Sequence, residues 1–323
     1  MRKVKAIYIE PHGPLTEWGQ AVADIVGPRH NLSMYDHGKP MAPQFADIEV
    51  AIDLGGENMK RPMFEASKNL KFWQMLTVGY DFGRDLRYAE EKELATSHCP
   101  GWTSAPGLAE AALMFMLMLN KNYKESQDTI RCGELHSPSV GDLEGQVLGI
   151  IGFGASGKAL AHRAQAFGML IMIIEPLPIE QELLDAIQPV FRGKPDAIDH
   201  VMSEADFISL HVPVTTETGG MIDSRRISLM KPTACLINVA RGNLVDEAAL
   251  HAALLQDKIG GIGTDVFFNY DVKPSQTLLD HPRFVALPHV SGSSPHSMAS
   301  RAKVALENLD RIAEGLDPKY RVV

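Results

Sequence analysis

Residues 147–175, VLGIIGFGASGKALAHRAQAFGMLIMIIE, hold the strongest fold signal in this chain of 323 residues. A short apolar run leads into the pattern Gly152-x-Gly154-x-x-Gly157, a helical run follows, and a second apolar run ends at Glu175. Strand, glycine turn and helix in this order are typical of a βαβ unit that binds a dinucleotide. Glycine permits the tight turn at 152, close approach of the backbone to a pyrophosphate at 154, and close helix–strand packing at 157.

The residues around this turn predict a site for NAD. Backbone N–H groups at the start of the helix, together with the helix dipole, attract a diphosphate, and Phe153, Ala155 and Ser156 complete the loop. An acid at Glu175 accepts hydrogen bonds from the adenosine ribose and repels the 2′-phosphate of NADP. The alternative is a purely structural glycine turn beside a surface glutamate, but strand, helix and acid together favour NAD.

Short apolar runs and helical stretches alternate along the rest of the chain. This order is typical of βαβ units, so we predict an α/β fold with doubly wound parallel sheets. The runs form an early and a late group, and the length of the chain fits two domains. Besides the two runs quoted above, the predicted strands are residues 5–9, 49–54, 71–76, 207–212, 234–240, 262–267 and 284–290.

Two long helical stretches stand out, residues 108–124 and 297–314. If the second packs back onto the first domain, that domain is discontinuous in sequence. In the first stretch we expect Met114, Met116 and Met118 to be core residues, because they belong to a continuous apolar run.

Composition limits the classes of partner. Lys+Arg is 31 and Asp+Glu is 40, a net charge of −9, which disfavours nucleic acid and anionic membranes as main partners. The three cysteines, Cys99, Cys132 and Cys235, include no Cys-x-x-Cys pair, so we expect neither a disulfide framework nor a metal site. The longest apolar stretch is too short to span a bilayer and no signal peptide is recognisable, so we expect a cytoplasmic protein.

Three side chains suit hydride transfer to a carbonyl, which needs a proton donor and a cation. Arg241 and His289 follow two predicted strands, and Asp265 lies near the end of another. In open α/β sheets such strand ends carry the ligand site. Each residue also has an ordinary structural interpretation, as a salt-bridge partner, a loop histidine or a turn former.

Longer stretches resemble one known family, the D-isomer-specific 2-hydroxyacid dehydrogenases. The resemblance is carried by HVPVTTETGGMIDSRRISLMKPTACLINVARGNLVDEAALHAAL (211–254), TDVF (264–267), PHVSGS (288–293), TVGYD (77–81) and the glycine loop. It implies two Rossmann-like domains with the active site in the cleft. A flavodoxin-like substrate domain would comprise residues 1–104 and 292–323, and an NAD-binding domain residues 105–291. It also implies a homodimer formed largely through NAD domains.

The resemblance implies roles for individual residues. Arg241 would bind the substrate carboxylate and carbonyl, His289 would be the general acid for reduction, and Asp265 would hold the nicotinamide carboxamide. The backbone of Val78 and Gly79 would bind the substrate carboxylate, and Ser104 falls where the family usually has an active-site asparagine. We further assign to the cofactor site His211, Val212, Pro213, Val239, Ala240 and Ser291, with His211 and Pro213 shaping its floor.

One position departs from the family pattern. The family places a glutamate five residues after the TDVF aspartate, hydrogen-bonded to the catalytic histidine, whereas this chain has Tyr270 followed by Asp271. A carboxylate stabilises the imidazolium, but a tyrosine hydroxyl only orients the ring. Either Asp271 substitutes for the glutamate, or carbonyl reduction is favoured at lower pH than in relatives with glutamate.

The sequence therefore predicts an NAD-dependent enzyme that interconverts a 2-oxoacid and a D-2-hydroxyacid. The loop Leu54-Gly-Gly-Glu57 carries an acid where relatives with phosphorylated substrates tend to have arginine, which favours a non-phosphorylated, glyoxylate-like, hydroxypyruvate-like or larger substrate. The altered position 270 leaves two alternatives, a formate-dehydrogenase-like enzyme and an NAD(H)-sensing binding protein that has lost catalysis.

Overall fold

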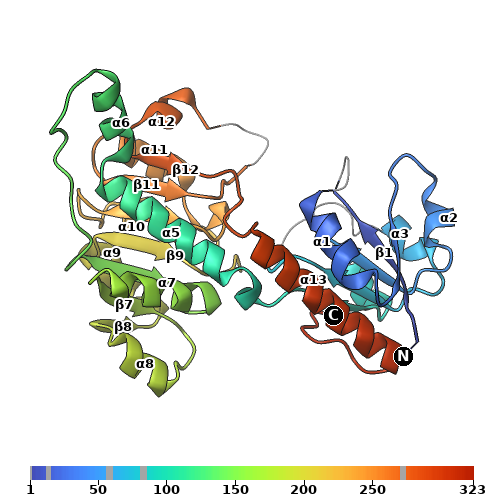
Figure 1. Cartoon of the computed structure of the whole chain (residues 1–323). Helices are drawn as coiled ribbons and strands as arrows, with labels where there is room; N and C mark the ends of the chain where they lie inside the picture. Colours follow the sequence, from blue (N-terminus) through green and yellow to red (C-terminus); the bar gives the residue numbers. More distant parts are fainter. Residues whose placement is uncertain (1, 12–15, 56–60, 81–85, 270–273) are drawn as a thin grey trace. The chain divides into compact units, whose positions relative to one another are not determined.

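The computed structural model describes residues 2–11, 16–55, 61–80, 86–269 and 274–323. The chain divides into two compact units (Figure 1). Unit 1 comprises Met1–Ser104 with Ser293–Val323, and unit 2 comprises Ala105–Gly292. Each unit is built on its own parallel sheet, so the predicted α/β class with two doubly wound parallel sheets is confirmed.

Unit 1 has a five-stranded sheet in the order β2-β1-β3-β4-β5. The order 2-1-3-4-5 is that of flavodoxin-like folds. Its strands are β1 (Lys5–Ile9), β2 (Asn31–Met34), β3 (Val50–Asp53), β4 (Phe72–Met75) and β5 (Ala95–Ser97). Its helices are α1 (Glu17–Val26), α2 (Met41–Phe45), α3 (Arg61–Ala66), α4 (Leu86–Glu91), the 3₁₀ turn η1 (Gly101–Thr103) and α13 (Pro295–Glu314).

The last helix, α13, belongs to the core of unit 1 although it follows unit 2 in the sequence. Its residues Ala302, Val304, Ala305 and Leu309 are buried with residues of α1, β1, β3 and β4. Ser294 caps the N-terminus by accepting the amide of Ser297, and Gly315 ends the helix in the left-handed conformation, as helix termini commonly do.

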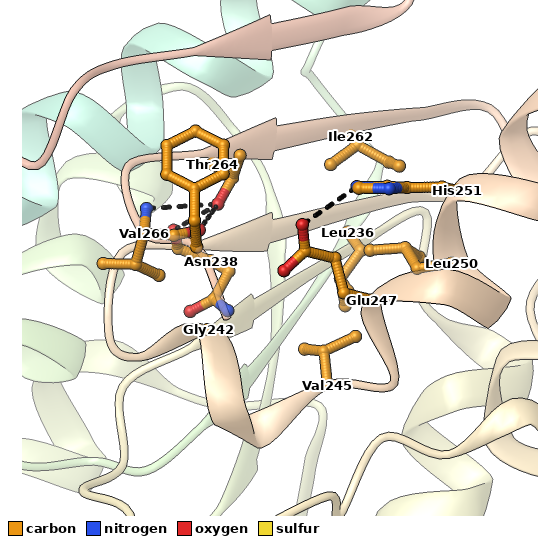
Figure 2. A pocket seen from close by; sticks show the side chains of 11 residues that line it. Leu236, Asn238, Gly242, Val245, Glu247, Leu250, His251, Ile262, Thr264 and Val266 are labelled. Carbon is orange, nitrogen blue, oxygen red and sulfur yellow. Dashed lines mark hydrogen bonds and ion pairs between the residues drawn. The ribbon is translucent and has the colours of Figure 1, made fainter. Parts of the chain in front are cut away.

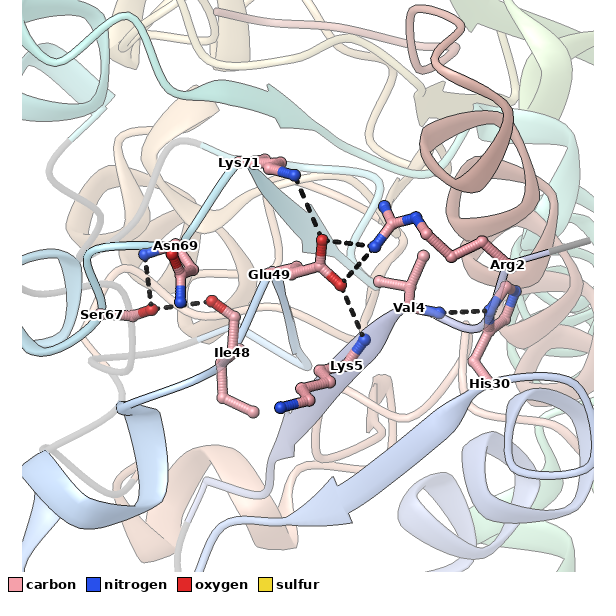
Figure 3. A network of polar contacts seen from close by, with 9 residues as sticks. All are labelled: Arg2, Val4, Lys5, His30, Ile48, Glu49, Ser67, Asn69 and Lys71. Atoms are coloured by element: carbon pink, nitrogen blue, oxygen red, sulfur yellow. Dashed lines mark hydrogen bonds and ion pairs between the residues drawn. The ribbon is translucent and has the colours of Figure 1, made fainter.

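Glu49 ties together the amino-terminal ends of three strands of unit 1 (Figure 3). Its carboxylate accepts hydrogen bonds from Arg2 at 2.7 and 2.8 Å, from the Lys5 amide at 3.2 Å and from Lys71 at 3.2 Å. Burial opposes ionisation, but these donors outweigh it and lower the pKa of Glu49. The contact aligns β1, β3 and β4 at the edge opposite their carboxyl ends.

Unit 2 has a seven-stranded sheet in the order β12-β11-β10-β9-β6-β7-β8. Read from β8, the first six strands follow the Rossmann order 3-2-1-4-5-6. The strands are β6 (Val147–Ile151), β7 (Leu170–Ile174), β8 (Phe191–Gly193), β9 (Phe207–Leu210), β10 (Cys235–Asn238), β11 (Gly261–Thr264) and β12 (Phe284–Ala286). The helical segments are α5 (Ala105–Asn120), α6 (Tyr123–Arg131), α7 (Ala155–Ala166), α8 (Gln181–Ile187), η2 (Pro195–Ala197), α9 (Ile198–Glu204), α10 (Ser224–Ile227), η3 (Gly242–Leu244), α11 (Glu247–Leu255) and α12 (Gln276–Asp280).

The structure corrects the sequence prediction at several elements. Each predicted run contains a strand, but β2, β5 and β8 were missed because they are short and, in β2 and β8, largely unburied. The predicted helix 108–124 is two helices, separated at Asn122 with φ +46. Of the three methionines predicted as core, Met116 is buried, whereas Met114 and Met118 are only partly buried.

Among the described residues, no helix is both long and apolar enough to cross a membrane. All three cysteines are free thiols, with Cys99 and Cys235 buried and Cys132 exposed.

Candidate active site

The glycine loop between β6 and α7 has an open side. At Gly152, with φ +94, a Cβ atom would lie 2.6 Å from the His211 carbonyl oxygen and 2.6 Å from a Val212 methyl; at Gly157 it would lie 2.2 Å from the Gly152 oxygen. At Gly154 a Cβ atom would meet nothing within 4 Å. Glycine is therefore needed by the fold at 152 and 157, whereas at 154 it keeps open a space beside the loop.

The start of α7 suits a diphosphate. Gly154 is the N-cap residue, and no side chain of the described residues caps the first turn of the helix. Uncapped amides at a helix N-terminus attract anions, with the helix dipole adding to the effect. The side chain of Ser156, in that first turn, instead contacts Nδ1 of His211 at 3.0 Å.

Glu175 is hydrogen-bonded to the same loop. Its Oε2 accepts the amide of Phe153 at 2.7 Å, and its Oε1 accepts the amide of Leu177 at 3.1 Å. Each carboxylate oxygen has a second acceptor position for a ribose hydroxyl. The acid predicted to recognise the ribose thus also holds the glycine loop, a contact that the sequence pattern did not predict.

His211 lies beneath the loop as a neutral side chain. Its Nε2 contacts Ser209 Oγ at 2.9 Å, and burial lowers the pKa of the imidazole to about 4. Its carbonyl oxygen and the next residue, Val212, enclose Gly152. His211 therefore supports the glycine loop from below, and its expected role in shaping the floor of the cofactor site stays a prediction.

Arg241 is positioned by the turn that follows β10. Asn238 Nδ2 donates to the Arg241 carbonyl at 2.9 Å, and Asn238 Oδ1 accepts the Ala240 amide at 3.1 Å. Arg241 Nη1 donates to the Ala240 carbonyl at 2.8 Å, and Val239 is buried. Asn238 was not among the predicted site residues, although an asparagine at a strand end is a known turn former.

The turn after Arg241 packs against the segment that follows Asp265. A Cβ atom at Gly242 would lie 2.1 Å from the carbonyl carbon of Phe267, so this position requires glycine. Glu247 Oε2 accepts the Phe268 amide at 2.7 Å. The two loops that carry Arg241 and Asp265 are therefore fixed to each other.

A small pocket lies beside these two loops, between α11 and strands β10 and β11 (Figure 2). Glu247 and His251 face each other in it, with Oε1 and Nε2 3.8 Å apart. Burial lowers the pKa of His251, and the negative charge of Glu247, which raises that pKa, offsets the effect only in part. Apolar side chains of the core, including Leu236, Leu250 and Ile262, line the rest, and no residue of the glycine loop takes part.

Asp265 fixes the backbone next to His289. The carboxylate is buried and accepts the amides of Val290 at 2.9 Å and Ser291 at 3.0 Å. His289 itself has φ +59, a conformation that is uncommon outside glycine and often found at functional sites. Within the described residues, the buried Ser291 Oγ has no hydrogen-bond partner.

The remaining predicted residues are Pro213 of unit 2, residues of unit 1, and residues that the structure does not describe. Val78 and Gly79 follow β4, and Ser104 is a buried residue after η1. Tyr270 and Asp271 lie outside the described residues, as does Glu57. Pro213 follows Val212 and its carbonyl accepts Thr218 Oγ1 at 2.6 Å.

Three features of unit 2 fit NAD. These are the open space at Gly154, the uncapped start of α7 and the acid at Glu175. They suit the diphosphate and ribose of a dinucleotide.

Comparison with known proteins gives the same answer. Residues 113–291 match the NAD-binding domain of D-isomer specific 2-hydroxyacid dehydrogenases. The glyoxylate reductase of Thermococcus litoralis is 32% identical over 285 residues, covering 84% of this chain and 82% of that protein. The hydroxypyruvate reductase of Thermotoga maritima is 32% identical over 277 residues, covering 84% and 85%.

Solved structures agree. D-lactate dehydrogenase from Aquifex aeolicus, complexed with NAD and lactic acid, has a TM-score of 0.78 and 26% identity, covering 96% of each chain. D-2-hydroxyisocaproate dehydrogenase has a TM-score of 0.84, covering 98% of this chain and 99% of that one; at 21% identity this likeness concerns the fold alone.

The fold and the glycine-loop site define a dinucleotide-binding protein of the Rossmann class. The chain belongs to the D-isomer specific 2-hydroxyacid dehydrogenase family, and residues 113–291 match the NAD-binding domain of that family.

Proposed function

We propose that this protein is an NAD-dependent D-2-hydroxyacid dehydrogenase that reduces a small, non-phosphorylated 2-oxoacid. One arrangement carries the proposal: the strand that ends at the glycine loop lies in one sheet with the strands that lead to Arg241, Asp265 and His289. The relatives named glyoxylate reductase and hydroxypyruvate reductase support a substrate of that size. They do not favour formate oxidation or a binding protein without catalysis.

The residues divide the work. His289 donates the proton to the developing alkoxide, held by a backbone that Asp265 anchors. Arg241 binds the substrate carboxylate and polarises its carbonyl, and Asp265 also receives the nicotinamide carboxamide. NADH, when bound, supplies the hydride. At the position of the family glutamate, we predict that either Tyr270 orients His289 or Asp271 substitutes for the missing carboxylate.

Substrate binding further involves our proposed substrate domain, residues 1–104 and 292–323, whose bounds differ from those of unit 1 only at Gly292. The amides of Val78 and Gly79 bind the carboxylate, and Ser104 contributes a hydroxyl. The proposed NAD-binding domain comprises residues 105–291.

We also propose a homodimer formed through unit 2, in the cytoplasm. Helix α6 has no buried residue, and its Tyr123 and Ile130 are 47% and 60% exposed. Leu135 and Val140, in the segment after it, are 72% and 48% exposed. Exposed apolar side chains within one segment favour a protein interface. Light scattering coupled to gel filtration should give twice the chain mass, and a monomer would contradict the dimer.

The test is NADH oxidation with glyoxylate, hydroxypyruvate, pyruvate, phenylpyruvate and a branched 2-oxoacid. NADPH replaces NADH in one control, and formate with NAD is the other. We expect turnover of at least one 2-oxoacid, with NADH preferred over NADPH. We expect no turnover of formate with NAD. NADH binding without turnover of any 2-oxoacid would contradict the proposal and favour a binding protein.

A further inference from the structure

The first three carbonyl groups after β4 each accept a hydrogen bond from within unit 1. Arg301 Nη1 donates to the Leu76 oxygen at 3.0 Å, and the Cys99 amide donates to the Thr77 oxygen at 2.9 Å. His98 Nδ1 lies 2.8 Å from the Val78 oxygen and donates to it. The orientation of these peptide groups is therefore fixed.

Two amide groups of the same loop, unlike its carbonyl groups, have no hydrogen-bond partner among the described residues. In the part of the chain that the structure describes, the amides of Val78 and Gly79 donate to no protein acceptor. Two successive backbone N–H groups available in this way suit an anion such as a carboxylate. The carbonyl contacts keep these amides from being turned away.

Arg301 is the unusual member of this set. It is 8% exposed and lies on α13 next to the buried apolar Ala302, three residues after Met298 and three before Val304. Its guanidinium packs over the ring of Trp18 at 5.0 Å. A charge in such surroundings is costly to bury, and an apolar side chain would fill the position without that cost.

The charge lies directly behind the loop. Because Leu76 is two residues before Val78, a guanidinium bonded to its carbonyl is within about 8 Å of the Val78 amide. A positive charge at such a distance attracts an anion, and the effect is larger where water is excluded. Nearby, burial raises the pKa of the Cys99 thiol to about 12, so this neighbour does not neutralise the guanidinium.

We propose that Arg301 is a positioning residue for the substrate: it fixes the Leu76–Thr77 peptide group, next to the two peptide groups that Cys99 and His98 fix, and adds positive charge behind the Val78 and Gly79 amides, so that they bind the carboxylate of a 2-oxoacid. This inference rests on the proposed function. It predicts that Arg301 affects substrate affinity more than the chemical step, because the guanidinium does not touch the reacting carbon.

The experiment compares wild type, Arg301→Met, Arg301→Lys and Lys303→Met with glyoxylate and hydroxypyruvate. Lys303 is an exposed cation on the same helix, so its variant removes one charge without touching the loop. For Arg301→Met we expect KM to rise about tenfold or more, the size of a charged hydrogen bond, with kcat changed less than about threefold. Lys303→Met should match wild type, and the NADH dissociation constant should stay the same in all.

Arg301→Lys keeps the charge but has a different donor geometry, so its KM should rise by about threefold or more. This variant decides the question if Arg301→Met does not fold, as judged by circular dichroism. A folded Arg301 variant with wild-type KM for both acids would overturn the inference while leaving the enzyme assignment intact. Failure of wild type to reduce any 2-oxoacid would instead overturn the proposed function.

Discussion

The buried carboxylate of Asp265 accepts the amide of Val290, the residue directly after His289. Its other oxygen accepts the Ser291 amide. Asp265 is thus joined to residues 25 and 26 positions further along the chain. His289, the proposed proton donor, directly precedes these two residues. The family resemblance assigns Asp265 to the nicotinamide; the structure adds an anchoring contact.

Asp265→Asn tests this anchor. An amide NH₂ cannot accept, so one of the two backbone amides loses its partner, at a cost of about 1–3 kcal/mol in unfolding free energy. We expect kcat to fall by about 10- to 100-fold, because proton transfer depends on placement. Asp246→Asn is the matched control: Asp246 caps α11 by accepting the Ala249 amide, and asparagine caps equally well. Wild-type kcat and stability in Asp265→Asn would contradict the anchor.

Gly154→Ala separates cofactor binding from folding. The added methyl meets no atom of the described structure within 4 Å, so the melting temperature should change by no more than about 2 °C. It would occupy the space proposed for the diphosphate, and the NADH dissociation constant, measured by fluorescence, should rise about tenfold or more. Gly157→Ala should instead destabilise the fold, because its methyl would lie 2.2 Å from the Gly152 oxygen. Unchanged NADH affinity in Gly154→Ala would exclude this loop as the diphosphate site.

Glu175→Ser tests cofactor choice. Without the acid, the 2′-phosphate of NADPH is no longer repelled, and the ribose of NADH loses a hydrogen-bond acceptor. The ratio of kcat/KM for NADPH to that for NADH should therefore rise about tenfold or more. Glu180→Ser serves as control, since Glu180 is an exposed acid paired with Lys158 at the same end of the sheet. An equal ratio in wild type and Glu175→Ser would show that Glu175 only holds the loop.

His211 predicts a pH dependence of stability. Its pKa is about 4 in the folded protein because of burial, against about 6.5 when unfolded. Between these values the unfolded chain binds more protons, so stability is complete above pH 6.5 and falls as pH drops towards 4, by at most about 3 kcal/mol. Between pH 7.5 and pH 5, the melting temperature of His211→Asn should fall by less than that of wild type. Parallel curves for the two proteins would refute this account.

The sequence predicts those elements of the fold that depend on a local pattern of residues. Buried strands such as β6 and β7 are runs of apolar residues, and the glycine turn has a required spacing. The short, largely unburied strands β2 and β8 lack that apolar pattern, and the break at Asn122 falls within a predicted helix.

Contacts between distant segments were beyond prediction because they form only when the chain packs. Glu175 with Phe153, Asp265 with Val290, and Arg301 with Leu76 are examples, the last spanning 225 positions. Arg301 did carry one signal: it lies on the same helical face as Met298 and Val304, where the pattern expects an apolar residue. Tyr270 lies outside the described residues, so its role stays a prediction.

The most direct test of the central claim is the kcat for hydroxypyruvate reduction by NADH in wild type and His289→Gln. We predict steady turnover by wild type and a loss of about 10²- to 10⁴-fold in the variant, the range of general acid catalysis, with the same NADH dissociation constant in both. Equal turnover by the two proteins would contradict the assignment of His289 as the proton donor.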